Sequence, residues 1–154
     1  MSSLAVLEKT AVASGGRLVS QWSQVVSLID AASWVIVTLD ALDELEQLPQ
    51  NWDTYGSDPI HPASLYKARA LVANIGINTL PTPQVIPVSG GSIGLVWKLG
   101  RKELELEVKP DGAIEYLRTV GRPTQANRNA MNTGQVGNDY IRDVRLLIKW
   151  LASE

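Results

Sequence analysis

The stretch QVIPVSGGSIGLVWKLGRKELELEVKPDGAIEYLRTV, residues 84–120, predicts four β-strands joined by three tight turns. Apolar and polar residues alternate along much of it, which is the pattern of strands with one buried and one solvated face. Turn residues interrupt the alternation at Gly90-Gly91, Gly100-Arg101 and Pro110-Asp111-Gly112. Glycine favours such turns because they need a backbone φ above zero.

The turns also predict which residues lie opposite one another. The expected pairs are Val88 with Ile93, Ile86 with Leu95, Trp97 with Leu104, Leu95 with Leu106, Ile93 with Val108, Val108 with Ile114, and Leu106 with Tyr116. All of these pairs share one face, and a one-residue slip would scatter them over both faces. We therefore expect an α+β fold: a four-stranded antiparallel meander packed on one face by N-terminal, central and C-terminal helices.

Helical periodicity, with apolar residues three or four positions apart, predicts those helices in residues 17–30, 37–49, 63–76 and 139–154. The apolar positions are Leu18, Trp22, Val25, Ile29, Leu39, Leu42, Leu45, Leu65, Ala68, Leu71, Val72, Ile75, Ile141, Val144, Ile148 and Leu151. Pro62 suits the start of the third helix and Gly76 its end, and Asn138 or Asp139 can cap the last. Residues 31–39 are rich in β-branched side chains and fit either a strand or the middle of a helix; we favour the helix.

The length of 154 residues predicts a single domain, 1–154. It divides into a helical N-terminal segment (1–49), a motif with a helix and the meander (50–120), and a polar loop with a C-terminal helix (121–154). The absence of Cys excludes disulfides, thiolate catalysis and Cys-based zinc sites, and it fits a reducing cytosol. The first residues lack the layout of a secretory signal, and no apolar run reaches the roughly 20 residues of a membrane span. We expect a cytoplasmic protein without membrane contact.

Charge is unevenly distributed along the chain, although the net charge is only −2. Residues 1–58 hold two basic and eight acidic side chains, whereas residues 117–154 hold six basic and three acidic ones. The two regions could face each other, solvate two surfaces, or steer a charged partner. A dense basic stripe is missing, which argues against nucleic-acid binding, including binding through Arg122, Arg128, Arg142 and Arg145.

The stretch QNWDTYGSDPIHP, residues 50–62, concentrates residues that could carry chemistry. Asp53, Asp58 and His61 could hold a divalent ion or act as an acid–base set. The same residues also suit turns: an Asx turn at Asp53, a left-handed Gly56, a turn at Asp58-Pro59 and a helix cap at His61. Trp52 and Tyr55 would then fill apolar surface between helices and sheet. We prefer this structural interpretation, and we expect neither a metal nor a cofactor.

This stretch also carries a resemblance. NWDTYGSDPI, followed by a helix, a Pro-spaced connector and a meander that ends in DGAIEYL, resembles small uncharacterised bacterial proteins with an NWDGYGA-type motif. The likeness covers roughly residues 48 to 118, and Thr54 and Ser57 stand where that motif tends to have Gly and Ala. It implies a shared fold, a bacterial or phage-related setting, and a structural motif made of Asn51, Trp52, Asp53, Tyr55, Gly56 and Asp58. It implies no catalytic residues.

Two further features are candidate partner-binding sites. Glu103, Glu105 and Glu107 alternate along one strand and share a face with Glu115, which the register places opposite Glu107. This face either is simply solvated, with Lys98 opposite Glu103, or binds a basic partner. The polar stretch 121–138 is long for a connector, and it either packs on itself or binds a partner through Arg122 and Arg128.

Without a recognisable catalytic set, the sequence favours a non-catalytic protein-binding accessory, inhibitor or immunity-type subunit. We expect it to act on a larger bacterial partner, such as the product of a neighbouring gene. The alternative is a small metal-dependent hydrolase that uses Asp53, Asp58 and His61.

Overall fold

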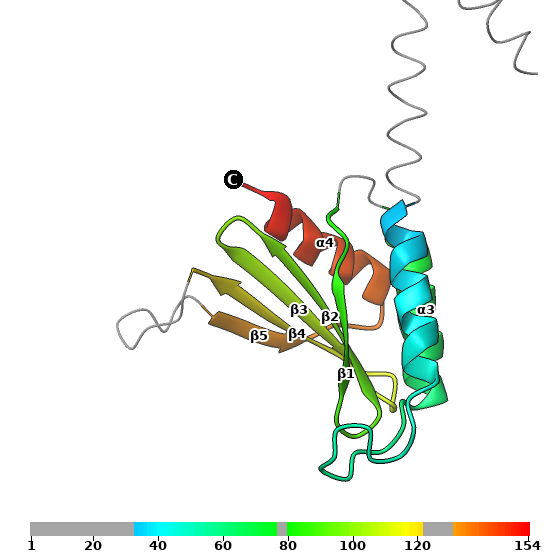
Figure 1. Cartoon of the computed structure of the whole chain (residues 1–154). Helices are drawn as coiled ribbons and strands as arrows, with labels where there is room; N and C mark the ends of the chain where they lie inside the picture. Colours follow the sequence, from blue (N-terminus) through cyan, green and yellow to red (C-terminus); the bar gives the residue numbers. More distant parts are fainter. Residues whose placement is uncertain (1–32, 77–79, 122–130) are drawn as a thin grey trace, which may run out of the picture.

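The computed structural model describes residues 33–76, 80–121 and 131–154 (Figure 1). These residues form a five-stranded antiparallel sheet in the order β1-β2-β3-β4-β5, together with three helices. The helices are residues 33–46, α3 (Pro62–Asn74) and α4 (Tyr140–Ala152). The strands are β1 (Gln84–Val88), β2 (Ser92–Leu99), β3 (Lys102–Val108), β4 (Ile114–Val120) and β5 (Met131–Gln135). The helix predicted in residues 17–30 lies outside the described residues.

The α+β class is confirmed, but the prediction of four strands is wrong because β5 pairs with β4 as a fifth. This strand lies within the stretch 121–138 that the sequence presents as a loop. Its residues, MNTGQ, do not alternate between apolar and polar, and most of their side chains are exposed. Backbone hydrogen bonds to β4 hold such an edge strand, and they leave no pattern in the side chains.

The predicted register is confirmed across β2, β3 and β4. Trp97 lies opposite Leu104, and Ile93 lies opposite Val108, which in turn lies opposite Ile114. The loop after β3 closes as expected, with Gly112 at a φ of 87°. Each of these apolar side chains is almost fully buried, so the three strands present one continuous apolar face.

The predicted pairing of β1 with β2 is wrong by one residue. Val88 lies opposite Ser92, so three residues form the loop instead of two. Gly90 and Gly91 do have the positive φ that suggested the turn, at 86° and 82°. Gly91 also lies close to the backbone of His61, because a Cβ at Gly91 would be 3.2 Å from the His61 backbone nitrogen. Glycine is therefore needed at position 91 for the contact with His61, which is distant in the sequence, as well as for the turn. The turn residues alone do not determine the loop length.

This shift moves Ile86 and Val88 to the face of the sheet that points away from the core. Val85 lies opposite Leu95 and packs against the core instead. Ile86 lies opposite Gly94 and covers it, since a Cβ at Gly94 would be 2.5 Å from Ile86 Cγ1. The missing side chain of Gly94 therefore makes room for Ile86.

The helices form as the apolar spacing predicts. Leu65, Ala68, Leu71 and Val72 line the buried side of α3, and Gly76 follows the helix with a φ of 64°. Asp139 caps α4 by accepting a hydrogen bond from the Arg142 amide at 3.3 Å. The buried side of α4 consists of Val144, Leu147, Ile148 and Leu151, with Ile141 partly buried.

Residues 33–46 are helical throughout, so the helix interpretation of residues 33–39 is confirmed and the strand alternative is wrong for them. Leu42 and Leu45 are buried as expected, and so are Trp34 and Thr38. The Thr38 hydroxyl donates to the Trp34 carbonyl at 2.6 Å, which satisfies this buried polar group within the helix.

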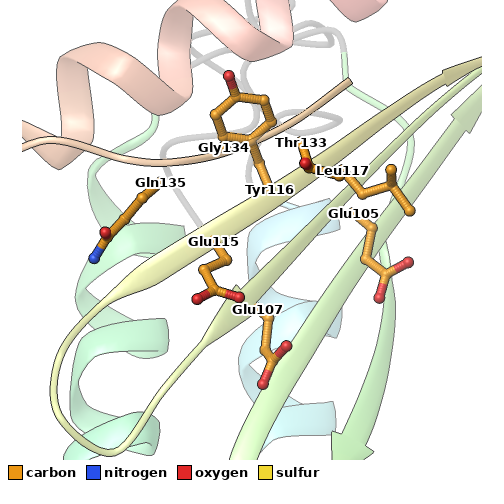
Figure 2. Close-up of a pocket in the computed structure, with 8 residues that line it drawn as sticks. All are labelled: Glu105, Glu107, Glu115, Tyr116, Leu117, Thr133, Gly134 and Gln135. Atoms are coloured by element: carbon orange, nitrogen blue, oxygen red, sulfur yellow. The ribbon is translucent and has the colours of Figure 1, made fainter. Parts of the chain in front are cut away.

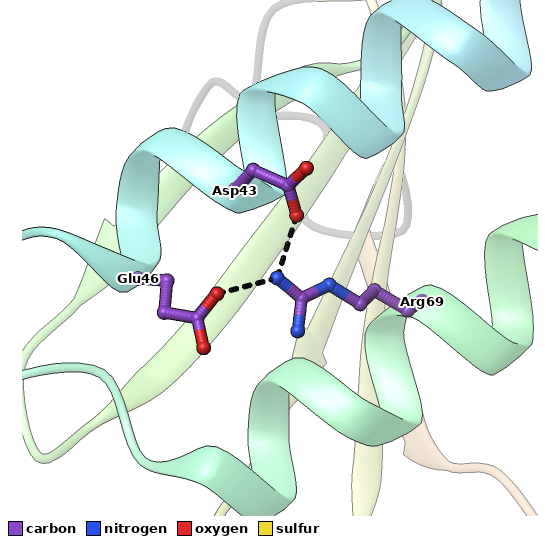
Figure 3. Close-up of polar contacts among 3 residues, drawn as sticks. All are labelled: Asp43, Glu46 and Arg69. Atoms are coloured by element: carbon purple, nitrogen blue, oxygen red, sulfur yellow. Dashed lines mark hydrogen bonds and ion pairs between the residues drawn. The ribbon is translucent and has the colours of Figure 1, made fainter.

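Side chains join the helices to one another. Arg69 of α3 donates to Asp43 at 2.6 Å and to Glu46 at 2.8 Å, which links α3 to the helix over residues 33–46 (Figure 3). Arg145 of α4 donates to the Ile75 carbonyl at 2.7 Å and to the Asn74 carbonyl at 2.8 Å. Its guanidinium therefore binds the carbonyl end of α3, where a cation is favourable.

A group of cations and aromatic rings holds the end of α4 against β3 and β4. The Lys102 ammonium donates to the Trp150 carbonyl at 3.0 Å and lies 5.4 Å from the Trp150 ring centre. The Arg118 guanidinium lies 5.1 Å from the same ring and 5.8 Å from the ring of Tyr116. Tyr116 in turn covers Gly134 of β5, where a Cβ would be 2.6 Å from the tyrosine hydroxyl.

The core lies between the helices and the apolar face of β2, β3 and β4. α3 packs against β2 and β3, and α4 packs against β3 (Figure 1). The largest fully buried side chains in the described residues are Trp97, Leu42, Leu71, Ile75, Ile93, Leu95, Leu104, Leu106, Ile114, Ile148, Leu151 and Val72. No described helix lies against the sheet face that carries Glu105 and Glu107.

The contact between Ile86 and Gly94 tests the register of β1. We expect Gly94→Ala to lower the free energy of unfolding by about 1–3 kcal/mol, because the new methyl group overlaps Ile86. Ile86→Ala removes the overlapping atoms, so the double variant should lose less stability than the two single variants together, by roughly 0.5–3 kcal/mol. Urea unfolding of the four proteins measures this coupling. If the two losses in stability simply add, the two residues are not in contact, which would contradict the observed register.

Candidate partner-binding site

Residues 50–62 form a closed loop whose polar groups bond to one another. The Asn51 amide donates to the Ser57 carbonyl at 2.8 Å, and the Asn51 side-chain oxygen accepts from the Gly56 amide at 2.6 Å. Asp53 accepts from the Tyr55 amide at 2.9 Å, from the Ser57 amide at 3.1 Å and from the Ser57 hydroxyl at 2.5 Å. The expected Asx turn at Asp53 and the left-handed Gly56, at a φ of 91°, are therefore confirmed.

The loop also attaches the start of α3 to the turn between β1 and β2. The Ser57 and Ser89 hydroxyl oxygens lie 3.0 Å apart, and the His61 amide donates to the Gly91 carbonyl at 3.0 Å. His61 Nδ1 accepts from the Ala63 amide at 3.1 Å, which confirms the predicted cap. The role of His61 in the described structure is therefore to begin a helix.

The two aromatic residues of the loop do not fill the space between helices and sheet as expected. Tyr55 is 93% exposed, because the chain turns through left-handed conformations at Thr54 and Gly56 on either side of it. Trp52 is half-buried outside the core, and its indole N–H donates to the Asp58 carbonyl at 3.0 Å. The loop is thus held by its backbone, by its polar side chains and by Ile60, which is buried in the core.

The carboxylates of this loop do not converge. Asp53 is engaged as described above, and the Asp58 carboxylate accepts from Gln50 Nε2 at 3.1 Å. Within the described ranges, no three His, Asp or Glu side chains gather as metal ligands would. The structure therefore does not assemble Asp53, Asp58 and His61 into one site.

Thr54 has a φ of 65°, which is rare for a β-branched residue. The left-handed conformation costs a residue with a Cβ roughly 1–2 kcal/mol, whereas glycine adopts it freely. We expect Thr54→Gly to raise the free energy of unfolding by about 0.5–1 kcal/mol, after the larger entropy of glycine in the unfolded chain is subtracted. Thr54→Ala keeps the Cβ and is the control, measured by urea unfolding beside it. Equal stability of the two variants would contradict the explanation.

Asp53 should titrate below its ordinary pKa, chiefly because the Ser57 hydroxyl donates to its carboxylate. Desolvation acts in the opposite direction, and hydrogen bonds from the backbone amides of Tyr55, Ser57 and Asp53 lower the pKa further. A depressed folded pKa stabilises the protein above the ordinary Asp pKa, and this stabilisation is lost as pH falls through the folded value. We expect Ser57→Ala to raise the pKa of Asp53 and to reduce stability near neutral pH, with a smaller difference near about pH 3. Carboxyl NMR titration and unfolding at both pH values measure this. Ser89→Ala is the control. An unchanged pKa of Asp53 in Ser57→Ala would show that the Ser57 hydroxyl does not cause the shift.

The four glutamates of the sheet lie on the face opposite the core, as predicted. The register arranges this face in rows that cross the strands. One row runs Gln84, Val96, Glu105, Leu117 and Thr133, and the next runs Ile86, Gly94, Glu107, Glu115 and Gln135. We call the region around Glu105, Glu107, Glu115 and Leu117 the acidic face. It combines carboxylates with the half-buried side chain of Leu117.

Two of the glutamates have cationic partners and two do not. Lys98 lies 3.3 Å from Glu103, and Lys109 lies 2.6 Å from Glu115. The Lys109 contact, which the sequence interpretation missed, relieves the like-charge pair of Glu107 and Glu115; hydrogen bonding to Glu115 raises the pKa of Lys109. Lys109 stands two positions after Glu107, so the alternation of the strand could have indicated it. Among the described residues, Glu105 and Glu107 have no ion-pair partner.

A shallow depression of about 360 Å³ lies on the acidic face (Figure 2). It is lined by Glu105, Glu107, Glu115, Tyr116, Leu117, Thr133, Gly134 and Gln135. The strand β5 supplies the last three of these residues, so the sequence interpretation, which lacked β5, missed that side of the site. These residues do not alternate between apolar and polar, so nothing in the sequence indicated a strand there.

The structure does not test the two arginines that were predicted as partner-binding residues. Arg122 and Arg128 lie outside the described residues. Arg145 is exposed, and it donates from Nε and Nη2 to the carbonyl end of α3. Arg142 is exposed on α4, which packs on the other side of the sheet.

Comparison of the chain with protein-family models, curated proteins and solved structures finds no match. The resemblance of residues 48 to 118 to the proteins with an NWDGYGA-type motif therefore stays an expectation. In the part of the chain that the structure describes, no helix combines the length and the apolar character needed to cross a membrane.

Proposed function

We propose that this chain is a non-catalytic protein-binding subunit of the accessory, inhibitor or immunity type, and that it binds a basic segment of a larger bacterial partner. The acidic face would be the binding site. The observation that carries the proposal is the pair Glu105 and Glu107, which lie two positions apart on the same face of β3 and have no ion-pair partner among the described residues.

The composition of the face suits lysine and arginine side chains. Leu117 lies directly opposite Glu105 and is half-buried, whereas Val96, on the other side of Glu105, is buried. A basic side chain could lay its methylene stem along Leu117 while its charged head reaches a carboxylate. Charge complementarity of this kind contributes mainly to the rate and the specificity of association. The described structure supports this function better than the hydrolase, because Asp53, Asp58 and His61 serve the loop 50–62.

Charge reversal on the face tests the proposal. We expect the immobilised wild-type chain to capture a partner from a lysate of its host and to release it at high salt, since screening weakens surface charge pairs. The double variant Glu105→Lys, Glu107→Lys should remain folded and lose at least roughly tenfold in association rate with that partner.

The matched control is Asp40→Lys with Glu44→Lys, which changes the net charge equally on exposed residues of the helix over residues 33–46. This control should retain binding. Equal binding by the two double variants would move the contact away from the acidic face, and a partner bound independently of salt and of both pairs would refute the proposal.

A further inference from the structure

β5 is the last strand of the sheet, and its outer edge has a defined hydrogen-bonding pattern. Opposite residues in an antiparallel pair alternate between those that exchange backbone hydrogen bonds and those that do not. The Val136 amide donates to the Ile114 carbonyl at 2.8 Å, so this opposite pair belongs to the first kind. Because the alternation repeats every two residues, Gly134 also bonds to β4 through its backbone. Thr133 and Gln135, which lie between the bonded positions, direct their N–H and C=O groups away from β4.

The pairing of β3 with β4 supports the same alternation independently. The Lys109 amide donates to the Ala113 carbonyl at 2.9 Å, so Glu107 and Glu115 are a hydrogen-bonded pair of β3 and β4. Glu115 therefore directs its backbone groups to β3, which leaves Gln135 opposite it without a backbone bond to β4. Among the described residues, no hydrogen bond reaches the outward backbone groups of Thr133 and Gln135.

The two edge strands of the sheet, β1 and β5, differ in how well they are protected against pairing with a further strand. Edge strands are commonly blocked by proline, by charged side chains or by a covering element. β1 contains Pro87, which has no N–H to offer a further strand. β5 contains neither proline nor a charged residue, and its side chains are mostly exposed. Within the described ranges, none of these devices protects the outer edge of β5.

The side chains beside this edge indicate what such a strand would carry. Thr133 and Gln135 point to the acidic face and line its depression (Figure 2). A strand added to β5 would lie about 4.8 Å further out, with every second side chain on that same face. A lysine or arginine there could extend across the small Thr133 towards Leu117 and Glu115. An acidic or a bulky apolar side chain would find no such complement.

We propose that an extended segment of the partner adds to the outer edge of β5 as an antiparallel sixth strand, with Lys or Arg at alternate positions over the acidic face. This inference rests on the proposed function and specifies its partner: a basic β-strand, bound by backbone hydrogen bonds and selected by charge.

The probe is the peptide Lys-Thr-Lys-Thr-Lys-Thr-Lys, followed by amide NMR of the full chain. In antiparallel pairing, residues whose side chains lie beside Thr133 also direct their N–H groups to β5. We therefore expect N-methylation of the lysines to weaken binding at least roughly tenfold, whereas N-methylation of the threonines leaves it unchanged. Shifted amides should include Thr133 and Gln135.

A variant of the chain provides the second arm. Thr133→Pro removes an outward N–H without removing a bond to β4, and proline is tolerated at such edge positions. It should bind the peptide at least roughly tenfold more weakly, whereas Thr133→Val, which also replaces the threonine side chain but keeps the N–H, should lose much less binding than Thr133→Pro. Unchanged amide spectra elsewhere show that the fold of Thr133→Pro is intact.

The outcomes separate this inference from the proposed function. If Thr133→Pro and the N-methyl-lysine peptide bind normally while Glu105→Lys with Glu107→Lys does not, the acidic face stands and strand addition is wrong. If methylation of the threonines is what abolishes binding, antiparallel addition is wrong. A wild-type dimer in sedimentation that Thr133→Pro dissociates would assign the edge to a second copy of the chain and overturn the proposal.

Discussion

The register of β2, β3 and β4 is the constraint on which the other features depend. Successive residues of a strand point to opposite faces, so a single alignment of the three strands determines both surfaces of the sheet. It collects Trp97, Leu104 and Ile114 against the helices and, on the other side, collects Glu105, Glu107 and Glu115. A slip of one residue in any pair would bury carboxylates and expose the core, which makes the alternatives much less stable. The acidic face is thus a geometric consequence of how the core is built.

Features with local causes could be predicted from the sequence, and those with distant causes could not. The alternation of β3, the apolar stripe of α3 and the cap at His61 each depend on residues close together in the chain, and each was predicted correctly. The alignment of β1 depends on Gly91 meeting His61, which lies 30 positions earlier, so its turn residues were misleading. β5 depends on backbone pairing and on the space that Gly134 leaves for Tyr116, neither of which produces a periodic pattern.

The candidate site divides in the same way. The glutamates and their common face follow from alternation alone, and so does Lys98 opposite Glu103. The depression requires β5, and for that reason the sequence could not indicate it. Tyr55 illustrates the opposite error: an aromatic residue in a motif suggests burial, yet left-handed backbone on both sides directs it outwards. Loop conformation is decided by a few φ angles, which composition does not reveal.

The alternation of the strands also separates two kinds of selection on the same short segment. Inward positions of β3, such as Leu104, contact the core and tolerate little change in volume. Outward positions, such as Glu105, touch neighbours only on the open face, where substitutions usually alter stability by no more than about 0.5 kcal/mol. Every second codon of the strand can therefore vary without loss of the fold. A lineage that carries this sheet could change the chemistry it recognises in single steps, while the scaffold beneath it stays under purifying selection.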